Sequence, residues 1–341
     1  PHARRTRDFD LPSEAETAEA MNATAVEDLT FVGSPSQSIG VELEFQIVDR
    51  ESGDLAPGAT RILPVAQEMY GDTVSAELMQ SMIEIKTGVC ANVAQARAQL
   101  VPVIRDVRNI AVSLGYDLSV GGLHPFNKSS TSTIFPSPRY EKMEKRMAGV
   151  AYQVVVFGLH VHVGVPSGDT AMAVTNVLVQ YLPHLLAASV NSPAWQGLDT
   201  GMASYRTALF GLIPRVGVPH YFARWKDFCN YVEVMRDCKA IQNTKDIHWD
   251  IRPRPQTGTI EFRVCDMPPT LEHAMAITAL ARCLVVGALR LLERKPNLRH
   301  GDRRSFWILP ENKWLAARYG LQAECIRTPG GKKMPLKAEL A

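Results

Sequence analysis

The sequence predicts an α+β fold whose sheet is mostly antiparallel, and two observations lead to this prediction. Short runs of alternating apolar and polar residues, which are typical of strands, recur along the chain. Longer runs with apolar residues at helical spacing also occur, but they do not separate the strands one by one, as a doubly wound parallel sheet would require. The sequence contains no repeat and no Gly/Ser linker, so we expect one domain.

The alternating runs predict six strands, at 39–48, 81–87, 116–121, 154–165, 247–252 and 258–265. Three longer runs predict helices, at about 92–114, 170–190 and 270–294. The first helix keeps apolar residues at helical spacing and is followed by Gly115, a common stop signal. The third opens with Thr270 in the N-cap position and is apolar enough to be largely buried.

The composition is that of a globular protein, with 46% hydrophobic and 21% charged residues among 341. The net charge is only +2, so the chain lacks the concentrated basic face that a nucleic acid or an anionic membrane surface requires. The segment from Thr170 to Leu198 has no charged residue, but polar residues and Pro183 interrupt it. That pattern favours a buried core helix over a membrane span.

The six cysteines are scattered and include no Cys-x-x-Cys pair. A disulfide framework or a structural zinc site would need close, repeated spacings, so we expect free thiols in a reducing cytoplasm. The first eight residues are not followed by the apolar core of a signal peptide. We therefore expect a cytoplasmic protein.

Five of the predicted strands carry reactive side chains on one face, because side chains alternate between faces with period two. The residues that share a face within each strand are Glu42 and Glu44; Glu84 and Lys86; His160 and His162; His248, Asp250 and Arg252; and Glu261 and Arg263.

One such strand alone would be read as a half-exposed strand with its polar side in water. Five of them, rich in Glu, His, Asp and Arg, indicate a site for hard cations and phosphates. Clustered carboxylates repel one another unless cations compensate, and carboxylates with a few imidazoles suit Mg²⁺ or Mn²⁺. Arginines on the same surface can hold phosphates. The chain has no Gly-rich phosphate loop, so ATP would have to bind through metals and arginines on the sheet.

Seven short motifs occur in the order of a known family. They are Gly40–Phe45 (GVELEF), Gly122–Phe126 (GLHPF), Arg139–Tyr140, Gly158–Gly164 (GLHVHVG), Asp199–Arg206 (DTGMASYR), Trp249–Pro253 (WDIRP) and Gly258–Val264 (GTIEFRV). Each is short, but together they resemble the type 2 glutamate–cysteine ligase family, the YbdK-like carboxylate–amine ligases. The resemblance runs from about Leu29 to Leu321.

The resemblance implies a glutamine-synthetase-like fold, with a mostly antiparallel curved sheet, helices packed on one face, and ATP and Mg²⁺ on the other. By similarity, the expected metal ligands are Glu42, Glu44, Glu84 and Glu261, followed by Glu77 and His160. Arg263 is the expected phosphate contact, and Arg252 and Arg206 are expected to bind ATP phosphates or the substrate carboxylate. Such ligases phosphorylate a carboxylate with ATP, and an amine then attacks the acyl phosphate.

The same resemblance gives the expected organisation and partners. Residues 1–37 are expected to form a mobile N-terminal extension, 38–325 the catalytic domain, and 326–341 a C-terminal tail that is shorter than in relatives. The partners are small amino-acid substrates, and a homodimer is the default assembly. Two alternatives stay open, namely a metal-dependent hydrolase with a Glu/His cluster and a non-catalytic binding protein that keeps the fold.

Overall fold

The computed structural model describes residues 29–128, 131–300, 303–327 and 331–340. Contacts divide the chain into two units, Pro1–Thr30 and Phe31–Ala341, and the fold described below is that of the second unit. The expected N-terminal extension falls mostly outside the described residues, so its boundary at residue 37 stays a prediction.

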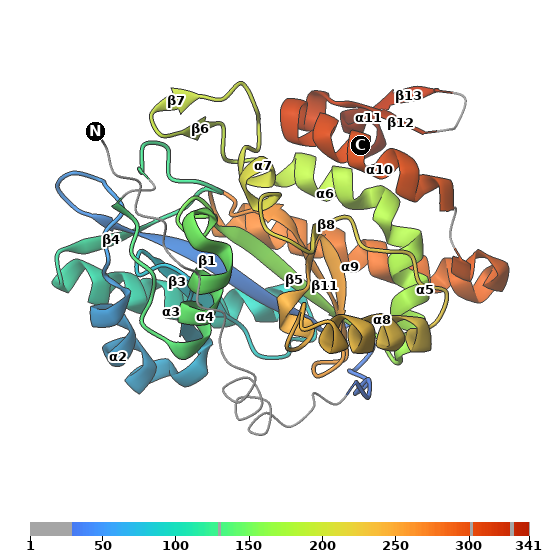
Figure 1. Cartoon of the computed structure of the whole chain (residues 1–341), viewed down its shortest axis with the longest axis horizontal. Coiled ribbons are helices and arrows are strands. Elements are labelled where there is room, and N and C mark those ends of the chain that lie inside the picture. The colour runs from blue at the N-terminus through green and yellow to red at the C-terminus, as the bar shows by residue number, and fades with distance from the viewer. Residues whose placement is uncertain (1–28, 129–130, 301–302, 328–330, 341) are drawn as a thin grey trace, which may run out of the picture. The chain divides into compact units, whose positions relative to one another are not determined.

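A seven-stranded sheet forms the centre of this unit (Figure 1). Its strand order is β10-β11-β5-β1-β3-β2, with β4 pairing to β1 as well, and every pairing is antiparallel. The strands are β1 (Ile39–Asp49), β2 (Val74–Ala76), β3 (Met82–Lys86), β4 (Tyr116–Ser119), β5 (Gly158–Gly164), β10 (Ile251–Arg254) and β11 (Thr259–Asp266). The mostly antiparallel sheet predicted from the alternating runs is therefore confirmed.

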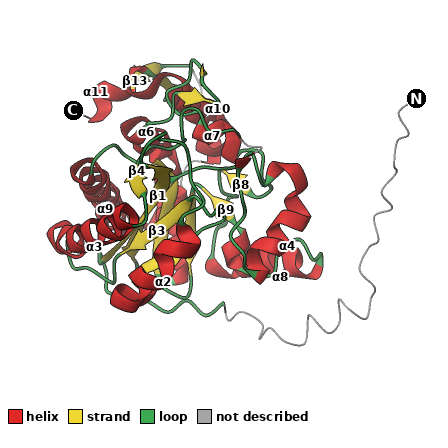
Figure 2. Ribbon diagram, turned by 90° about the vertical axis from the view of Figure 1, so that its left-hand side faces the viewer, coloured by secondary structure: helices red, strands yellow, loops and turns green. Residues whose placement is uncertain are grey.

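Helices cover one face of the sheet, on which apolar strand residues such as Val41, Leu43 and Phe262 are buried. These helices are α2 (Ala59–Tyr70), α3 (Val93–Ser113), α5 (Gly168–Leu178), α6 (Leu182–Ser189) and α9 (Leu271–Arg294). Figure 2 shows α3 and α9 on one side of β1 and β3, and α4 on the other. The apolar half of each alternating strand thus explains which face the helices take.

The remaining elements lie around this two-layer core. The helices are α4 (Pro138–Met147), α7 (Arg206–Phe210), α8 (Trp225–Asp237), α10 (Arg303–Tyr319) and α11 (Leu336–Leu340). Three two-stranded pairs are β6 (Ala194–Trp195) with β7 (Leu198–Asp199), β8 (Val216–Gly217) with β9 (His248–Trp249), and β12 (Glu324–Ile326) with β13 (Lys333–Pro335). The described residues after 326 thus form a strand and a helix, whose Leu336 is buried.

Two of the three predicted helices form as expected, and the third is interrupted. Thr270 caps α9 by accepting a hydrogen bond from the backbone N–H of His273. The helix predicted at 170–190 is split into α5 and α6 by a 3-10 turn over Val179–Tyr181. Pro183, which has no N–H to donate, stands in the first turn of α6, where a helix tolerates it.

The prediction of one continuous strand at 247–252 is wrong. It breaks at Asp250, so that β9 pairs in parallel with β8 while β10 begins at Ile251. The Asp250 carboxylate lies 2.7 Å from the Nζ of Lys313 on α10. Asp250 therefore does not share the face of Arg252, because the break ends the alternation on which that expectation rested.

Two helical segments among the described residues are long and apolar enough to span a membrane by length and composition alone. They are Gly168–Ser189 and Leu271–Arg294. In the first, 83% of the most apolar stretch is buried inside the structure, as in core helices of globular proteins. In the second only 39% of that stretch is buried, so the expectation that the helix at 270–294 is largely buried is wrong.

Candidate active site

The antiparallel register places the reactive side chains of neighbouring strands side by side on the face opposite the core helices. Glu42 lies between His160 on β5 and Lys86 on β3, and Glu44 pairs with Glu84. At the other edge, Glu261 lies between His162 on β5 and Arg252 on β10. Period-two alternation fixes the face of each residue, and the strand order then brings them together.

This polar face forms the floor of a cavity of about 260 Å³. Charged residues from the sheet line it together with α4, Phe210, Ile213 and the segment before β10. The lining residues named by the sequence analysis as site candidates are Glu42, Glu44, Glu77, Glu84, His160, Arg252 and Arg263. Strands, helices and loops from distant parts of the chain thus converge on one concave site, as expected for a binding or catalytic centre.

The carboxylates and imidazoles of this face form three groups that could each hold a metal ion. The groups share members and are Glu42–His162–Glu261, Glu42–Glu84–His160 and Glu44–Glu77–Glu84, each with its ligand atoms within 4.8 Å of one another. The Nε2 atoms of His160 and His162 are buried and form no hydrogen bond, although carboxylate oxygens lie 3.6 and 3.2 Å away. Unpartnered imidazole nitrogens beside oxygen-rich groups fit divalent cations such as Mg²⁺ or Mn²⁺.

Charge repulsion within the carboxylate groups appears in their pKa values. Burial, with the nearby charges of Glu84 and Glu44, raises the pKa of Glu77 well above its usual range. Burial and the charge of Glu42 also raise the pKa of Glu84. For Glu42 burial acts in the same direction, but the imidazoles of His162 and His160 outweigh it and hold this pKa well below the usual range. A bound cation would relieve the repulsion at Glu77 and Glu84.

Glu261 has a different environment, because arginines surround it. Arg252 donates from Nε and Nη2 to its two oxygens at 2.8 and 3.2 Å, and Arg263 donates from Nη1 at 2.5 Å. Arg254 lies 3.6 Å away. Burial raises the pKa of Glu261, but Arg252 and Arg263 outweigh it and bring it well below the usual range. The same burial lowers the pKa of Arg252 to about 10.

The arginines also keep donors free. The Nε atoms of Arg254 and Arg263 are buried and form no hydrogen bond. The Nε of Arg254 lies 3.6 Å from an oxygen of Glu261. Both residues line the cavity, so their guanidinium groups can contact a phosphate or carboxylate bound there. Arg252 is instead committed to Glu261 and to the backbone carbonyl of Ile247. Its contacts favour a role in orienting Glu261, while the expected contact with ATP phosphates or the substrate carboxylate stays a prediction.

Two site candidates, Glu261 and Arg206, do not line the cavity, although Glu261 contacts the lining residues Arg252 and Arg263. Arg206 has a different environment. It is 3% exposed, its Nη1 lies 3.9 Å from Asp266, and its Nη2 donates to the carbonyl of Arg263 at 3.4 Å. Its guanidinium also lies over the ring of Phe210, which lines the cavity. Its role as a substrate or phosphate contact stays a prediction, while these contacts favour a role in positioning Arg263 and Phe210.

An Arg206→Met variant is expected to lose roughly 3–5 kcal/mol of unfolding free energy, because it leaves the buried Asp266 carboxylate without its cation. Urea unfolding measures this loss. Arg224→Met, at an exposed ion pair with Asp227, is the matched control and should change stability by less than about 1 kcal/mol. Unchanged stability with impaired substrate binding would instead assign Arg206 to direct contact.

The sequence analysis gave no role to several cavity residues, namely Arg139, Tyr140, Lys245 and Arg254. His248 also lines the cavity, and it had been placed on a reactive strand face without a role of its own. Arg254 lies two residues after Arg252 and continues the same alternation. The sequence therefore contained a signal for its position on the polar face. Arg139 stood in a family motif without a role. Lys245 lies in a 3-10 turn and had no signal. Arg139 and Lys245 have no ion-pair partner within the described part of the chain, so both are available to an anionic ligand.

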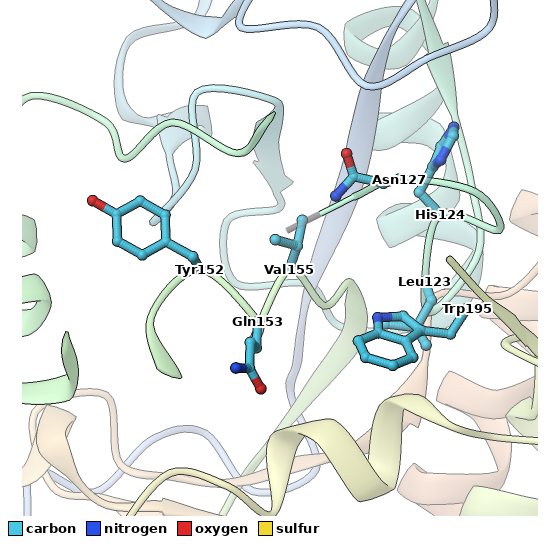
Figure 3. Close-up of a pocket in the computed structure, with 7 residues that line it drawn as sticks. All are labelled: Leu123, His124, Asn127, Tyr152, Gln153, Val155 and Trp195. Carbon is cyan, nitrogen blue, oxygen red and sulfur yellow. The ribbon is translucent and has the colours of Figure 1, made fainter. Parts of the chain in front are cut away.

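A second, very small cavity lies beside the segment that precedes β5 (Figure 3). Gln153 and Val155 line it together with Trp195 and His124, whereas Val154 and Val156 line the large cavity. Alternate residues of this segment thus face two different spaces. At about 10 Å³ the small cavity holds no more than a water molecule, so the large one is the candidate active site.

The sheet and its helices form a fold that is also found in the class of the glutamate–cysteine ligases. Among solved structures, the chain is similar in fold to a glutamate–cysteine ligase from Francisella tularensis in complex with AMP. The TM-score is 0.63 with 14% sequence identity, and the match covers 91% of this chain and 77% of that one. The antiparallel sheet with helices is thus the fold of a ligase of this class.

The chain belongs to glutamate–cysteine ligase family 2 (GCS2), whose family model matches residues 38–340. A protein of Solibacter usitatus, provisionally named glutamate–cysteine ligase 2, is 40% identical over 86% of this chain and 75% of its own length. A protein of Frankia alni, provisionally named glutamate–cysteine ligase 2-1, is 39% identical over 87% of this chain and 78% of its own length. The expected family is therefore confirmed, and the chain is an enzyme of the ligase class.

Proposed function

We propose that this ligase uses ATP and Mg²⁺ to join the carboxylate of one amino acid to the amine of another, with glutamate and cysteine as the first pair to test. One observation carries the proposal, namely that carboxylate groups able to hold metals and arginines with free N–H groups share one cavity. The family supports the ligase reaction, and the related fold of a ligase crystallised with AMP supports the use of a nucleotide. Since all six cysteines are free thiols, we also propose a cytoplasmic location.

In the proposed reaction, an oxygen of the substrate carboxylate attacks the γ-phosphorus of ATP, and the bond from that phosphorus to ADP breaks. The amine nitrogen then attacks the acyl carbon, the bond to phosphate breaks, and the nitrogen loses a proton. The products are an amide, ADP and phosphate. This route needs no covalent nucleophile from the protein, so the residues of the cavity act by positioning and by neutralising charge.

The residues divide this work between two sides of the cavity. Bound Mg²⁺ would supply positive charge to the phosphates, and Glu42, Glu44, Glu77, Glu84 and His160 would hold it. Arg263 and Arg254 line the same cavity and would contact the transferring phosphoryl group through their guanidinium groups. Glu261 fixes these arginines, and it can also complete the metal group with Glu42 and His162.

Two cationic side chains of the cavity, those of Arg139 and Lys245, support an acid substrate that carries a second anionic group. Arg139 and Lys245 reach the same cavity and have no acidic partner among the residues that the structure describes. An amino acid such as glutamate presents an α-carboxylate in addition to the carboxylate that reacts. We assign Arg139 and Lys245 to that second carboxylate or to a nucleotide phosphate.

The test is to incubate purified protein with ATP, Mg²⁺ and a panel of amino-acid pairs, and to follow ADP release and amide formation. ADP and amide in equal amounts are expected for at least one pair. A metal-dependent hydrolase would turn over substrate without nucleotide, and a binding protein would release no ADP. Absence of ADP with every pair would therefore contradict the proposal.

A further inference from the structure

The attacking amine must lose a proton inside the active-site cavity, and none of the residues assigned above accepts it. At neutral pH an amino acid carries its amine largely as an ammonium group, whose nitrogen has no lone pair with which to attack. The reaction therefore calls for a side chain that lines the cavity and can take up a proton. Such a side chain has to be uncharged or anionic, and free of a competing cation.

Most polar side chains that line the cavity are unsuited to this task. The lining glutamates and His160 belong to the groups that could hold metals, and a bound cation would lower their basicity. The lining arginines and lysines are hydrogen-bond donors without an acceptor atom. Tyr140 donates its hydroxyl hydrogen to the carbonyl of Ala76, and burial raises its pKa, so it keeps its proton at neutral pH. His248 is the remaining imidazole among the lining residues.

The short parallel pair of β8 and β9 turns the imidazole of His248 towards the cavity. The backbone N–H of His248 donates to the carbonyl of Arg215 at 2.9 Å. The next residue, Trp249, is 2% exposed and packs against the ring of Tyr231, so alternation along the strand puts His248 on the opposite face. There its imidazole makes an edge-to-face contact with Phe210, which also lines the cavity, with the ring centroids 6.2 Å apart.

The imidazole of His248 differs from the other imidazoles of the site in its contacts. His248 is half-buried, and neither of its ring nitrogens has a hydrogen-bond partner within the described part of the chain. In His160 the Nδ1 atom is engaged by Glu42 at 3.1 Å, and in His162 it is engaged by Thr259 at 3.0 Å. An imidazole with free nitrogens on the wall of a cavity can exchange a proton with a ligand bound there.

Cationic side chains around His248 link its basicity to the bound substrates. Burial and the charges of four arginines hold the pKa of His248 well below its usual range, so the imidazole is uncharged at neutral pH. These arginines are Arg252 on β10, Arg263 on β11, Arg139 on α4 and Arg215 in the segment before β8, and Lys245 lines the same cavity. The phosphates of ATP and the substrate carboxylates would neutralise these charges, and the pKa of His248 would then rise. The imidazole thus becomes a stronger base when the anionic substrates are bound.

We propose that His248 accepts the proton of the attacking amine, a role that rests on the proposed ligase function. One N–H bond of the ammonium group breaks and its proton passes to a ring nitrogen of His248, which leaves the amine nitrogen with a lone pair. This pair forms the bond to the acyl carbon while the bond to phosphate breaks. The departing phosphate takes the second proton of the nitrogen, and the imidazolium returns its proton to solvent as the products leave.

A change of amine separates this role from a structural one. The variant His248→Gln keeps a polar side chain but cannot take a proton from an ammonium group. With ATP, Mg²⁺, cysteine and the acid that reacts in the panel, glutamate first, its kcat should fall about 100-fold or more at an unchanged KM for ATP. Hydroxylamine is largely unprotonated at neutral pH, so with hydroxylamine in place of cysteine the variant should stay within about three-fold of the wild type. The matched control is His220→Gln, at an exposed histidine that does not line the cavity, which should change neither rate.

The pH dependence of kcat with cysteine gives a second readout. In His248→Gln, hydroxide from solvent has to remove the proton, so kcat should rise about ten-fold per pH unit around neutrality, whereas the wild type should change little there. Equal losses with cysteine and hydroxylamine, or the same pH slope in both proteins, would overturn the role of His248 and leave the ligase function standing. A wild type that is inactive with every amino-acid pair and with hydroxylamine would overturn the ligase function, and the role of His248 with it.

Discussion

A Glu77→Gln variant is expected to lose ligase activity by about two orders of magnitude or more, while the metal-free protein becomes more stable than the wild type. Glu77 belongs to the group of Glu44 and Glu84 that could hold a metal, and burial together with these two charges raises its pKa well above the usual range. Gln keeps the shape of the side chain and removes the charge. The variant thus loses both a proposed metal ligand and a source of repulsion.

The same raised pKa predicts how stability depends on pH. Between the ordinary carboxyl pKa and the raised pKa of Glu77, the folded protein holds a proton that the unfolded chain has released. The unfolding free energy of the metal-free wild type should therefore fall as pH rises through this window, by up to about 1.4 kcal/mol per pH unit for one proton. This component should disappear in Glu77→Gln.

Urea unfolding with chelator, at several pH values, measures both effects, and ADP release measures the activity. The matched control is Glu68→Gln, an exposed glutamate on α2, which should change neither quantity. If Glu77→Gln lowered the unfolding free energy of the metal-free protein, repulsion among Glu44, Glu77 and Glu84 would not be what destabilises the wild type. Full activity in the variant would remove Glu77 from the proposed site.

Glu261→Gln should also abolish turnover, but it should lower the unfolding free energy by roughly 3–5 kcal/mol. Glu261 is 1% exposed and is the shared anion of Arg252, Arg254 and Arg263. Removing its charge leaves three arginines uncompensated in the interior, although Gln can still accept hydrogen bonds. The same substitution at two carboxylates of the candidate site, one lining the cavity and one behind its arginines, is therefore expected to have opposite effects on stability.

The contributions of Glu77 and Glu261 to the pH dependence of the unfolding free energy should also differ in sign. Because Arg252 and Arg263 bring the pKa of Glu261 well below the usual range, its contribution to stability is present above the ordinary carboxyl pKa. It is lost as pH falls through the lowered value. A second variant, Glu261→Gln with Arg252→Met, should recover part of the stability but no activity. A Glu261→Gln protein as stable as the wild type would show that solvent or an ion neutralises the arginines.

Local alternation predicted most strands of the sheet and the faces of their side chains, since an alternation of period two is a local property of the chain. It thereby determined that Glu42, Glu44, Glu84, His160, Glu261 and Arg263 are available on polar strand faces, and the seven motifs added the family. Alternation missed β2 and placed Asp250 on the wrong face. What the sequence could not determine was which faces meet, because antiparallel partners such as Glu42 and His160 are far apart along the chain.

Tertiary structure also decided the residues that local pattern cannot place. Alternation put Asp250 beside Arg252, but a strand break turned its carboxylate to Lys313 on a distant helix. Arg206 stood in a family motif, yet its guanidinium is buried beside the Asp266 carboxylate and does not line the cavity. Lys245 carried no signal and still reached the cavity. The sequence determines side-chain type and local periodicity. Charge compensation depends on contacts between residues that are far apart in the chain, and only the fold brings these together.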